Sequence, residues 1–203
     1  ELRAHGVRNL FMEIAVNKEV TENFRLTFRK SVVSVLNEYG LIDQYTSLIN
    51  PLYLDYNDLK IITEKKANII LCPRDLNYFT NRYFPIDDFI GHGIRFSIAT
   101  GWLGEDLLKD VRLFRNRYKE LNLSSIDLLM AITKIPYKLY FNGDNSGYDF
   151  SLDINKQADM IMIDISDTRF QFFPEDFEFR NVCDFLVDNL TAYNVSDVII
   201  GGR

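Results

Sequence analysis

The sequence contains little cysteine, little histidine and no long uninterrupted hydrophobic segment. Its two cysteines, Cys72 and Cys183, form no paired framework, which favours free buried thiols in a reducing cytoplasm. No apolar run approaches the roughly 18 residues that span a bilayer, and no signal peptide begins the chain, so we expect a cytoplasmic protein without a membrane anchor. The two histidines, His5 and His92, each precede an expected strand, at the end of a sheet away from the usual site of chemistry.

Basic residues are also in the minority. The 23 Lys and Arg residues against 29 Asp and Glu residues give a net charge of −6 and a pI near 5.0. A phosphate backbone requires a basic stripe, so the composition argues against nucleic acid and anionic membranes as partners. What the chain does have is 47% hydrophobic residues in a length of 203, enough for a sizeable core in one domain with a small appendage.

Apolar β-branched and aromatic runs alternate with helical patterns as far as about residue 142. The expected strands are residues 8–14, 25–28, 46–49, 68–71 and 94–99. The expected helices include one that ends at Gly40, one capped by Asp55, one that carries Leu107 and Val111 on one face, and one capped by Ser124 or Ser125. This alternation predicts parallel strands covered by helices. Five such units are fewer than the eight of a closed barrel, so we expect an α/β fold with a partial or distorted TIM-like (β/α) barrel.

The organisation changes in two places. Only about ten residues separate the first two expected strands, whereas a parallel crossover takes a dozen or more, so the connection is trimmed or some chain is absent there. The segment "NGDNSGYDFSLDINK" is rich in turn formers, and "ADMIMIDIS", "FQFFPEDFEF" and "VSDVIIGG" after it predict strands of a small separate sheet. We therefore expect a barrel part in residues 1–145 and a small β domain in residues 146–203.

Four segments share motifs with one known family. They are "ANIILCPRDLNYFTNRYFPI", "GIRFSIATGWLGEDLLKDVRLF", "SLDINKQADMIMIDIS" and "VSDVIIGGR". In this order they resemble the CPRSN strand and loop, the next strand and helix, and two strands of the C-terminal sheet of the amidohydrolase superfamily. The likeness is to its cytosine deaminase, chlorohydrolase and methylthioadenosine deaminase branch. It runs from about residue 7 to the end and matches nothing of the first barrel strands, so it implies the C-terminal part of the barrel with the family's small β domain.

The resemblance implies a barrel that holds zinc or iron at the C-terminal ends of its strands, where the metal activates a water for C–N hydrolysis. The family's ligand positions are substituted here: Thr27 and Lys30 stand for a His and a Glu three residues later, Asn50 for a second His, and Gly101 for an Asp. Because these groups are neutral or wrongly charged, we expect no bound metal, no cofactor and no catalytic residue.

Polar side chains are still expected at the catalytic end of the strands. A ligand-binding rim is predicted from Glu13, Arg29, Arg74, Asp75, Asn77 and Trp102. Arg29, Lys30 and Arg74 would receive an anion, and Trp102 would cover or line the emptied pocket. Local structural hydrogen bonding is the alternative for Arg74 and Asp75, and a simple place at a helix start is the alternative for Glu105 and Asp106.

Three functions remain open at this stage. The first is a metal-free pseudoenzyme related to the deaminases, which binds a small polar molecule or a partner chain and does not hydrolyse it. The second is an active metal-dependent hydrolase or deaminase whose remaining ligands lie in missing N-terminal strands. The third is a structural subunit that pairs its open barrel edges with another copy, so that a homo-oligomer or a missing N-terminal segment is expected.

Overall fold

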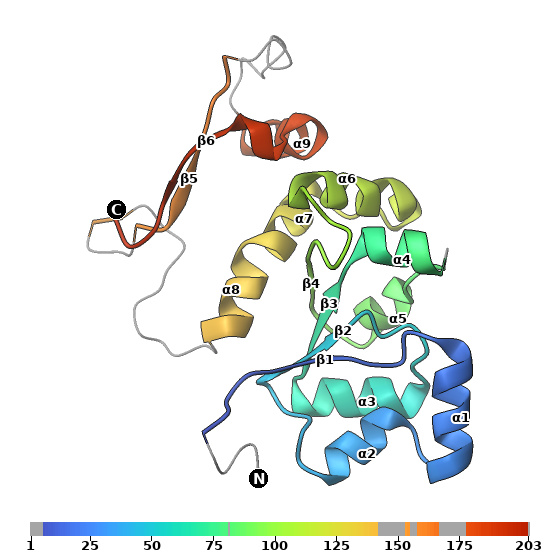
Figure 1. The fold of residues 1–203 in the computed structure, drawn as a ribbon. Coiled ribbons are helices and arrows are strands. Elements are labelled where there is room, and N and C mark those ends of the chain that lie inside the picture. The colour runs from blue at the N-terminus through green and yellow to red at the C-terminus, as the bar shows by residue number, and fades with distance from the viewer. Residues whose placement is uncertain (1–5, 81, 142–152, 155–157, 167–177, 203) are drawn as a thin grey trace.

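The fold was analysed in a computed structural model, which describes residues 6–80, 82–141, 153–154, 158–166 and 178–202 (Figure 1). Its main sheet is parallel, in the order β1 (Leu10–Glu13), β2 (Thr46–Ile49), β3 (Asn68–Leu71) and β4 (Phe96–Ile98). A second, antiparallel sheet pairs β5 (Met160–Ile163) with β6 (Val195–Ile199). Within the described residues the parallel sheet stays open, with β1 and β4 at its two edges.

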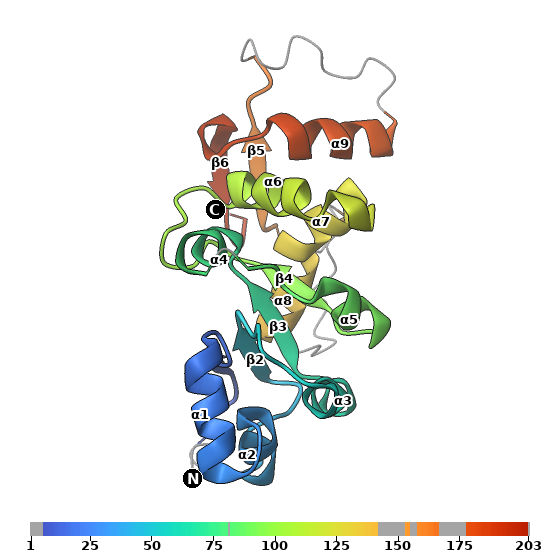
Figure 2. The same ribbon diagram turned by 90° about the vertical axis from the view of Figure 1, so that its right-hand side faces the viewer.

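Nine α-helices occur in the described parts of the chain. They are α1 (Lys18–Phe28), α2 (Val32–Glu38), α3 (Tyr56–Lys65), α4 (Pro73–Phe79), α5 (Ile86–Gly91), α6 (Leu107–Arg117), α7 (Ser125–Ile132), α8 (Lys134–Phe141) and α9 (Phe179–Asn189). Figure 2 shows α1, α2 and α3 together at the β1 end of the sheet and α6, α7 and α9 stacked at the β4 end. These six helices therefore form two groups, at opposite ends of the parallel sheet.

The ends of these helices follow from local sequence. In α3 the Asp55 carboxylate accepts the N–H of Asp58 at 3.0 Å, and the Asp58 carboxylate accepts the N–H of Asp55 at 3.1 Å. This reciprocal capping box satisfies two helix-end donors that would otherwise lack partners. Gly40, which follows α2, has a φ of +66°, a left-handed conformation that glycine adopts without steric cost. The predicted helices after Ser31 and Asp55 are confirmed, as is the cap at Ser124.

The core lies between the central strands and the helices that cover them. Leu48 of β2 and Ile69 of β3 are fully buried, together with Ile62 of α3 and Phe114 of α6. Burial of each such side chain contributes about 1.5–3 kcal/mol. β2 is buried along most of its length, as expected for a strand of a parallel sheet with both faces covered. This packing fixes the two central strands, and with them the loops at their C-terminal ends.

One predicted strand is wrong. Residues 25–28 form the last turns of α1, because the Asn17 side chain accepts the N–H of Val20 at 3.1 Å and starts a helix that continues to Phe28. Phe24 and Phe28 are four residues apart and their rings are in contact, which suits one helix face. The connection from β1 to β2 therefore contains α1 and α2, and the crossover is not too short. Among the described residues the parallel sheet has four strands and not the five expected.

The C-terminal part agrees with the sequence in its two strands and differs in a helix. The segments "ADMIMIDIS" and "VSDVIIGG" contain β5 and β6, which form a small separate sheet as predicted and pair with each other in antiparallel fashion. The predicted boundary at residue 145 and most of "FQFFPEDFEF" lie outside the described residues, and Phe179 at the end of that segment begins α9. The sequence analysis contains no prediction of α9.

No helix in the described part of the chain is both long enough and apolar enough to cross a membrane.

Candidate functional site

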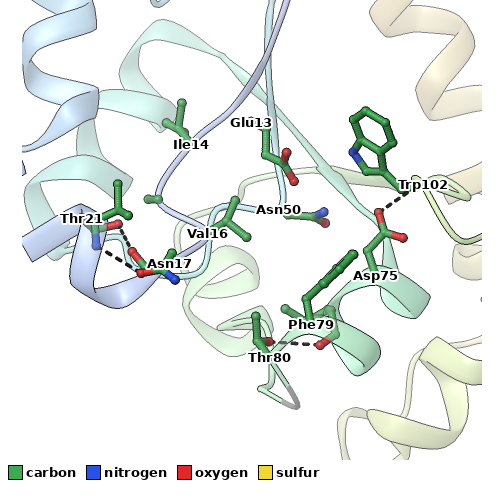
Figure 3. Close-up of a pocket in the computed structure, with 13 residues that line it drawn as sticks. Glu13, Ile14, Val16, Asn17, Thr21, Asn50, Asp75, Phe79, Thr80 and Trp102 are labelled. Carbon is green, nitrogen blue, oxygen red and sulfur yellow. Dashed lines mark hydrogen bonds between the residues drawn. The ribbon is translucent and has the colours of Figure 1, made fainter.

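The candidate site lies where the four parallel strands end. Glu13 ends β1, Asn50 follows β2, Asp75 lies in the first turn of α4 after β3, and Trp102 follows β4. The carboxyl ends of parallel strands meet at one edge of a sheet, and ligands bind there in many α/β folds. A pocket of about 590 Å³ opens at this edge, and Figure 3 shows these four residues among those that line it.

Asp75 is held by the loop that follows β4. Its side chain is only 3% exposed. The Oδ2 atom accepts the N–H of Trp102 at 2.9 Å, and the Oδ1 atom accepts the N–H of Leu103 at 3.0 Å (Figure 3 shows the first of these). Both carboxylate oxygens are therefore engaged by the protein's own backbone.

Gly101 is in direct contact with that carboxylate. Its φ is +65°, in the left-handed region, and a Cβ atom at this position would lie 2.0 Å from Asp75 Oδ2 and 2.8 Å from Cys72 Cβ. Real Cβ atoms do not approach other heavy atoms so closely. Position 101 can therefore hold only glycine while Asp75 keeps its place, which explains why this strand end carries no side chain.

Asn50 links the ends of β2 and β3. It is 2% exposed, and its Oδ1 atom accepts the N–H of Cys72 at 2.8 Å. Its φ of +50° is left-handed, a conformation that asparagine adopts more readily than most residues. Asn50 thus caps the end of β3, and its oxygen already has a donor.

Cys72 lies beneath these groups as an unreactive thiol. Burial is the main reason that its pKa is raised to about 12, and the nearby carboxylates of Asp75 and Glu13 raise it further. A thiol with so high a pKa is protonated at neutral pH, and the thiolate is the form that attacks electrophiles and binds metals. Cys72 is therefore a buried, packed residue behind the strand ends. Burial likewise raises the pKa of the Cys183 thiol in α9.

Glu13 differs from Asp75 in its surroundings. It is an exposed residue of β1, and Figure 3 shows its carboxylate directed into the pocket, above Asn50. Among the hydrogen bonds and ion pairs of the described residues, none involves Glu13. Its carboxylate is therefore available to a ligand.

Three predicted site residues lie elsewhere. Thr27 and Arg29 are at the end of α1, and neither these two nor Lys30 line the pocket. Thr27 Oγ1 donates to the Asn23 carbonyl at 2.9 Å, and Lys30 forms an ion pair with Glu38 at 2.6 Å. Thr27 and Lys30 were assigned as ligand positions because a strand was expected to end there. The segment is helical, so this basis for the assignment is lost.

Arg74 and Asn77 lie on α4 but point to α6. Arg74 Nε donates to Asp110 Oδ1 at 2.8 Å, and the Asn77 side chain accepts from Arg117. Asp110 is fully buried, and burial raises its pKa although Arg74 acts in the opposite direction. Neither Arg74 nor Asn77 lines the pocket, so the anion expected at Arg29, Lys30 and Arg74 has no basic receptor there.

Other predicted residues keep a place near the strand ends. Trp102 is 84% exposed at the pocket margin. Asp106 is the N-cap of α6 and accepts the N–H of Leu108 at 3.0 Å. The sequence analysis missed Val16, Phe79 and several other lining residues. The helix cap at Asn17 would have revealed part of this wall. A helix that starts after Asn17 leaves residues 14–17 as a loop after β1, and this loop lines the pocket.

The residues present do not fit a zinc or iron ion. A catalytic zinc site needs about three protein ligands with free lone pairs or thiolates. At these strand ends no His or Cys of the described chain lines the pocket, Gly101 supplies no side chain, and Asp75 and Asn50 are held in place by backbone N–H groups. Among the described residues, no three His, Cys, Asp or Glu side chains gather where they would hold a metal.

No protein-family model matches the sequence, and a search of curated proteins found no match. Solved structures do match. Guanine deaminase from E. coli superposes with a TM-score of 0.86 at 12% identity and covers 100% of this chain and 48% of its own. A zinc-bound adenosine deaminase from Xanthomonas campestris has a TM-score of 0.82 at 17% identity, covering 100% and 46%.

An atrazine chlorohydrolase from Arthrobacter aurescens in complex with zinc has a TM-score of 0.73 at 15% identity, covering 100% of this chain and 45% of its own. The chain thus spans about half the length of these structures. Identities this low carry the fold alone. The chain therefore has the fold of about half of each of these deaminase and chlorohydrolase structures.

Proposed function

We propose that this chain is a metal-independent relative of the amidohydrolase deaminases and chlorohydrolases, whose pocket binds a small polar molecule without hydrolysing it. One observation carries the proposal. Both oxygens of Asp75, the best-placed buried carboxylate of the rim, accept backbone N–H groups directly beside Gly101. The Asp75 carboxylate occupies the space beside Gly101 where a further ligand would have to lie, and its oxygens are held by the backbone.

The hydrogen bonds of Asp75 make metal capture costly. If Asp75 turned its carboxylate toward an ion in the pocket, the N–H groups of Trp102 and Leu103 would lose their acceptor. A buried donor left without a partner costs about 1–3 kcal/mol. A replacement ligand at Gly101 would overlap the same carboxylate. Both effects favour a rim that is closed to divalent ions at the ends of β3 and β4.

The pairing of β1 with β2 supports a different assignment of the family's first ligand position. Since β1 is the neighbour of β2, the strand end that precedes Asn50 in the ring is that of Glu13. We propose that Glu13 replaces the first metal-binding His, that Val16 replaces the Glu three residues later, and that Asn50 and Gly101 keep the places assigned from the sequence. Glu13 is the one substituted position that retains a free carboxylate.

A second candidate function is structural, and the open sheet favours it. Within the described part of the chain the outer edges of β1 and β4 have no strand partner. Unpaired edges of a parallel sheet attract further strands. Pairing with another copy or another segment would complete the ring and is compatible with ligand binding. An active hydrolase would in addition need its metal ligands from such a segment.

Elemental analysis of the purified full-length protein tests the proposal. We expect less than about 0.1 zinc, iron or manganese per chain, both as isolated and after incubation with zinc followed by desalting. Close to one metal per chain that disappears in Asp75→Ala would contradict the proposal. Asp87→Ala is the matched control, because Asp87 is an exposed carboxylate of α5 that does not line the pocket.

A further inference from the structure

The pocket carries charge of one sign. Its charged lining residues are Glu13 and Asp75, and no Lys, Arg or His is among the described residues that line it. The basic side chains expected there face other partners, since Arg74 pairs with Asp110 and Lys30 with Glu38. A cleft lined by negative charge repels anions and concentrates cations.

The two carboxylates are not equivalent. Both oxygens of Asp75 accept backbone N–H groups, whereas the carboxylate of Glu13 takes part in no hydrogen bond or ion pair among the described residues and points into the pocket (Figure 3). Both line the pocket, and both lie close enough to Cys72 to raise its pKa, so their negative fields overlap. A ligand would therefore meet Glu13 as its charged hydrogen-bond acceptor.

The walls around Glu13 are apolar and partly aromatic. Val16 and Leu76 line the pocket, and the ring of Phe79 extends from α4 toward Asn50 (Figure 3). Phe79 is 63% exposed, so its face is open to a ligand. Aromatic faces attract cations, and a pocket of about 590 Å³ has the size that holds small organic molecules.

We infer that this pocket selects an organic cation, an amidinium or a protonated amine on a flat apolar body, with its charge on Glu13 and its body against Phe79. The inference rests on the proposed function, because a metal ion would compete for Glu13. Two N–H groups of a planar amidinium would donate to the two carboxylate oxygens of Glu13, the bidentate geometry that is strongest for such pairs. The ligand is bound and released unchanged.

Isothermal titration calorimetry with three compounds of one shape tests the inference. The compounds are benzamidinium, its neutral analogue benzamide and its anionic analogue benzoate, each titrated into the full-length protein in EDTA. We expect benzamidinium to bind at least about tenfold more tightly than benzamide, as a hydrogen bond to a charged group predicts. Benzoate should give no binding heat.

Two variants assign the effect to the residue. Glu13→Gln should weaken benzamidinium binding about tenfold, to the level of benzamide. Glu64→Gln is the matched control: Glu64 is an exposed glutamate of α3 outside the pocket, and its variant should bind as the wild type does. Phe79→Leu should weaken benzamidinium and benzamide together, because it removes the ring and keeps the charge.

The outcomes separate this inference from the proposed function. Equal binding of benzamidinium and benzamide, no binding of either, or no effect of Glu13→Gln would overturn the organic-cation ligand and leave the metal-free site standing. Zinc that binds at one ion per chain and displaces benzamidinium would overturn the proposed function itself.

Discussion

The ends of β2, β3 and β4 and the end of β1 belong to the same rim, yet their polar groups are in opposite states. Asn50 and Asp75 are buried. The side-chain oxygen of Asn50 and both carboxylate oxygens of Asp75 accept hydrogen bonds from backbone N–H groups. Glu13, at the end of β1, is exposed and faces the pocket. The contrast shows that one half of the rim is held by the fold's own hydrogen bonds, while the other half keeps a carboxylate open to a ligand.

The largest expected effect is on Gly101, in the closed half. Gly101→Asp introduces the carboxylate that the resembling family carries at this strand end, but it forces a side chain into the Asp75 carboxylate and places two negative charges together. We expect a loss of about 3–5 kcal/mol in the free energy of unfolding, measured by urea denaturation, and no gain of metal or hydrolysis. Gly40→Asp is the control, since Gly40 has the same left-handed φ and nothing within 4 Å of an added Cβ. It should cost about 1 kcal/mol.

Equal losses in the two glycine variants would show that backbone strain alone matters and that Asp75 does not exclude a side chain. If Asp75 does exclude a side chain, removal of its carboxylate should relieve part of the stability loss caused by a side chain at position 101. In Gly101→Ala/Asp75→Ala we expect a smaller loss than the sum of the two single variants, which a double-mutant cycle measures. Metal-dependent deamination by the Gly101→Asp variant alone would show that the family's metal ligands have been assigned to the wrong positions in this chain.

The next largest effect concerns the two hydrogen bonds of Asp75. Asp75→Asn keeps the shape but replaces one acceptor oxygen with an NH₂ group, which faces a backbone N–H. We expect a loss of about 1–3 kcal/mol in the free energy of unfolding. Asp87→Asn, an exposed change on α5, should stay within about 0.5 kcal/mol. Amide hydrogen exchange at Trp102 and Leu103 should accelerate only in the first variant.

A smaller effect is the pH dependence from Asp110, behind the rim. Its folded pKa is raised by burial above the ordinary value of 3.8, so between these two values the folded state binds more protons than the unfolded state. Its contribution to stability therefore falls as the pH rises from about 4 through the folded pKa. Asp110→Asn, which keeps an acceptor for Arg74, should make this decline shallower. Burial also raises the pKa of Asp58, so part of the decline in stability should remain in the Asp110→Asn variant. An unchanged slope would show that Asp110 is not the source.

The smallest effect on stability is expected in the open half. Glu13→Gln removes no hydrogen bond found among the described residues, so the free energy of unfolding should change by less than about 0.5 kcal/mol. Thermal or urea unfolding measures this change. A loss above about 1 kcal/mol would mean that Glu13 holds the structure together, and the difference between the two halves of the rim would disappear.

Much of the sheet was predictable because local signals agreed there. The bounds of β2 and β3 follow from short apolar runs between turn formers, and α3 follows from the Asp55 cap. The segment before α2 was not predictable by the same means. Phe24, Leu26 and Phe28 alternate with polar residues as in a strand, and the cap at Asn17 that decides for a helix lies well upstream.

The candidate site was predictable only in part. Gly101 stands out in the sequence at a strand end that carries a carboxylate in the resembling family, but nothing local shows what fills the space. The answer is Asp75, which precedes Gly101 by 26 residues and meets it only through the pairing of β3 with β4. Contacts between loops at adjacent strand ends depend on tertiary packing, and single-sequence patterns do not contain them.

A crystal structure of the full-length protein grown with excess zinc, with anomalous data collected at the zinc edge, tests the central claim most directly. We predict that the Asp75 carboxylate still accepts the N–H groups of Trp102 and Leu103 and that no anomalous peak lies within bonding distance of Asp75 or Asn50. A fully occupied peak there, with Asp75 turned away from those N–H groups and onto the ion, would contradict it.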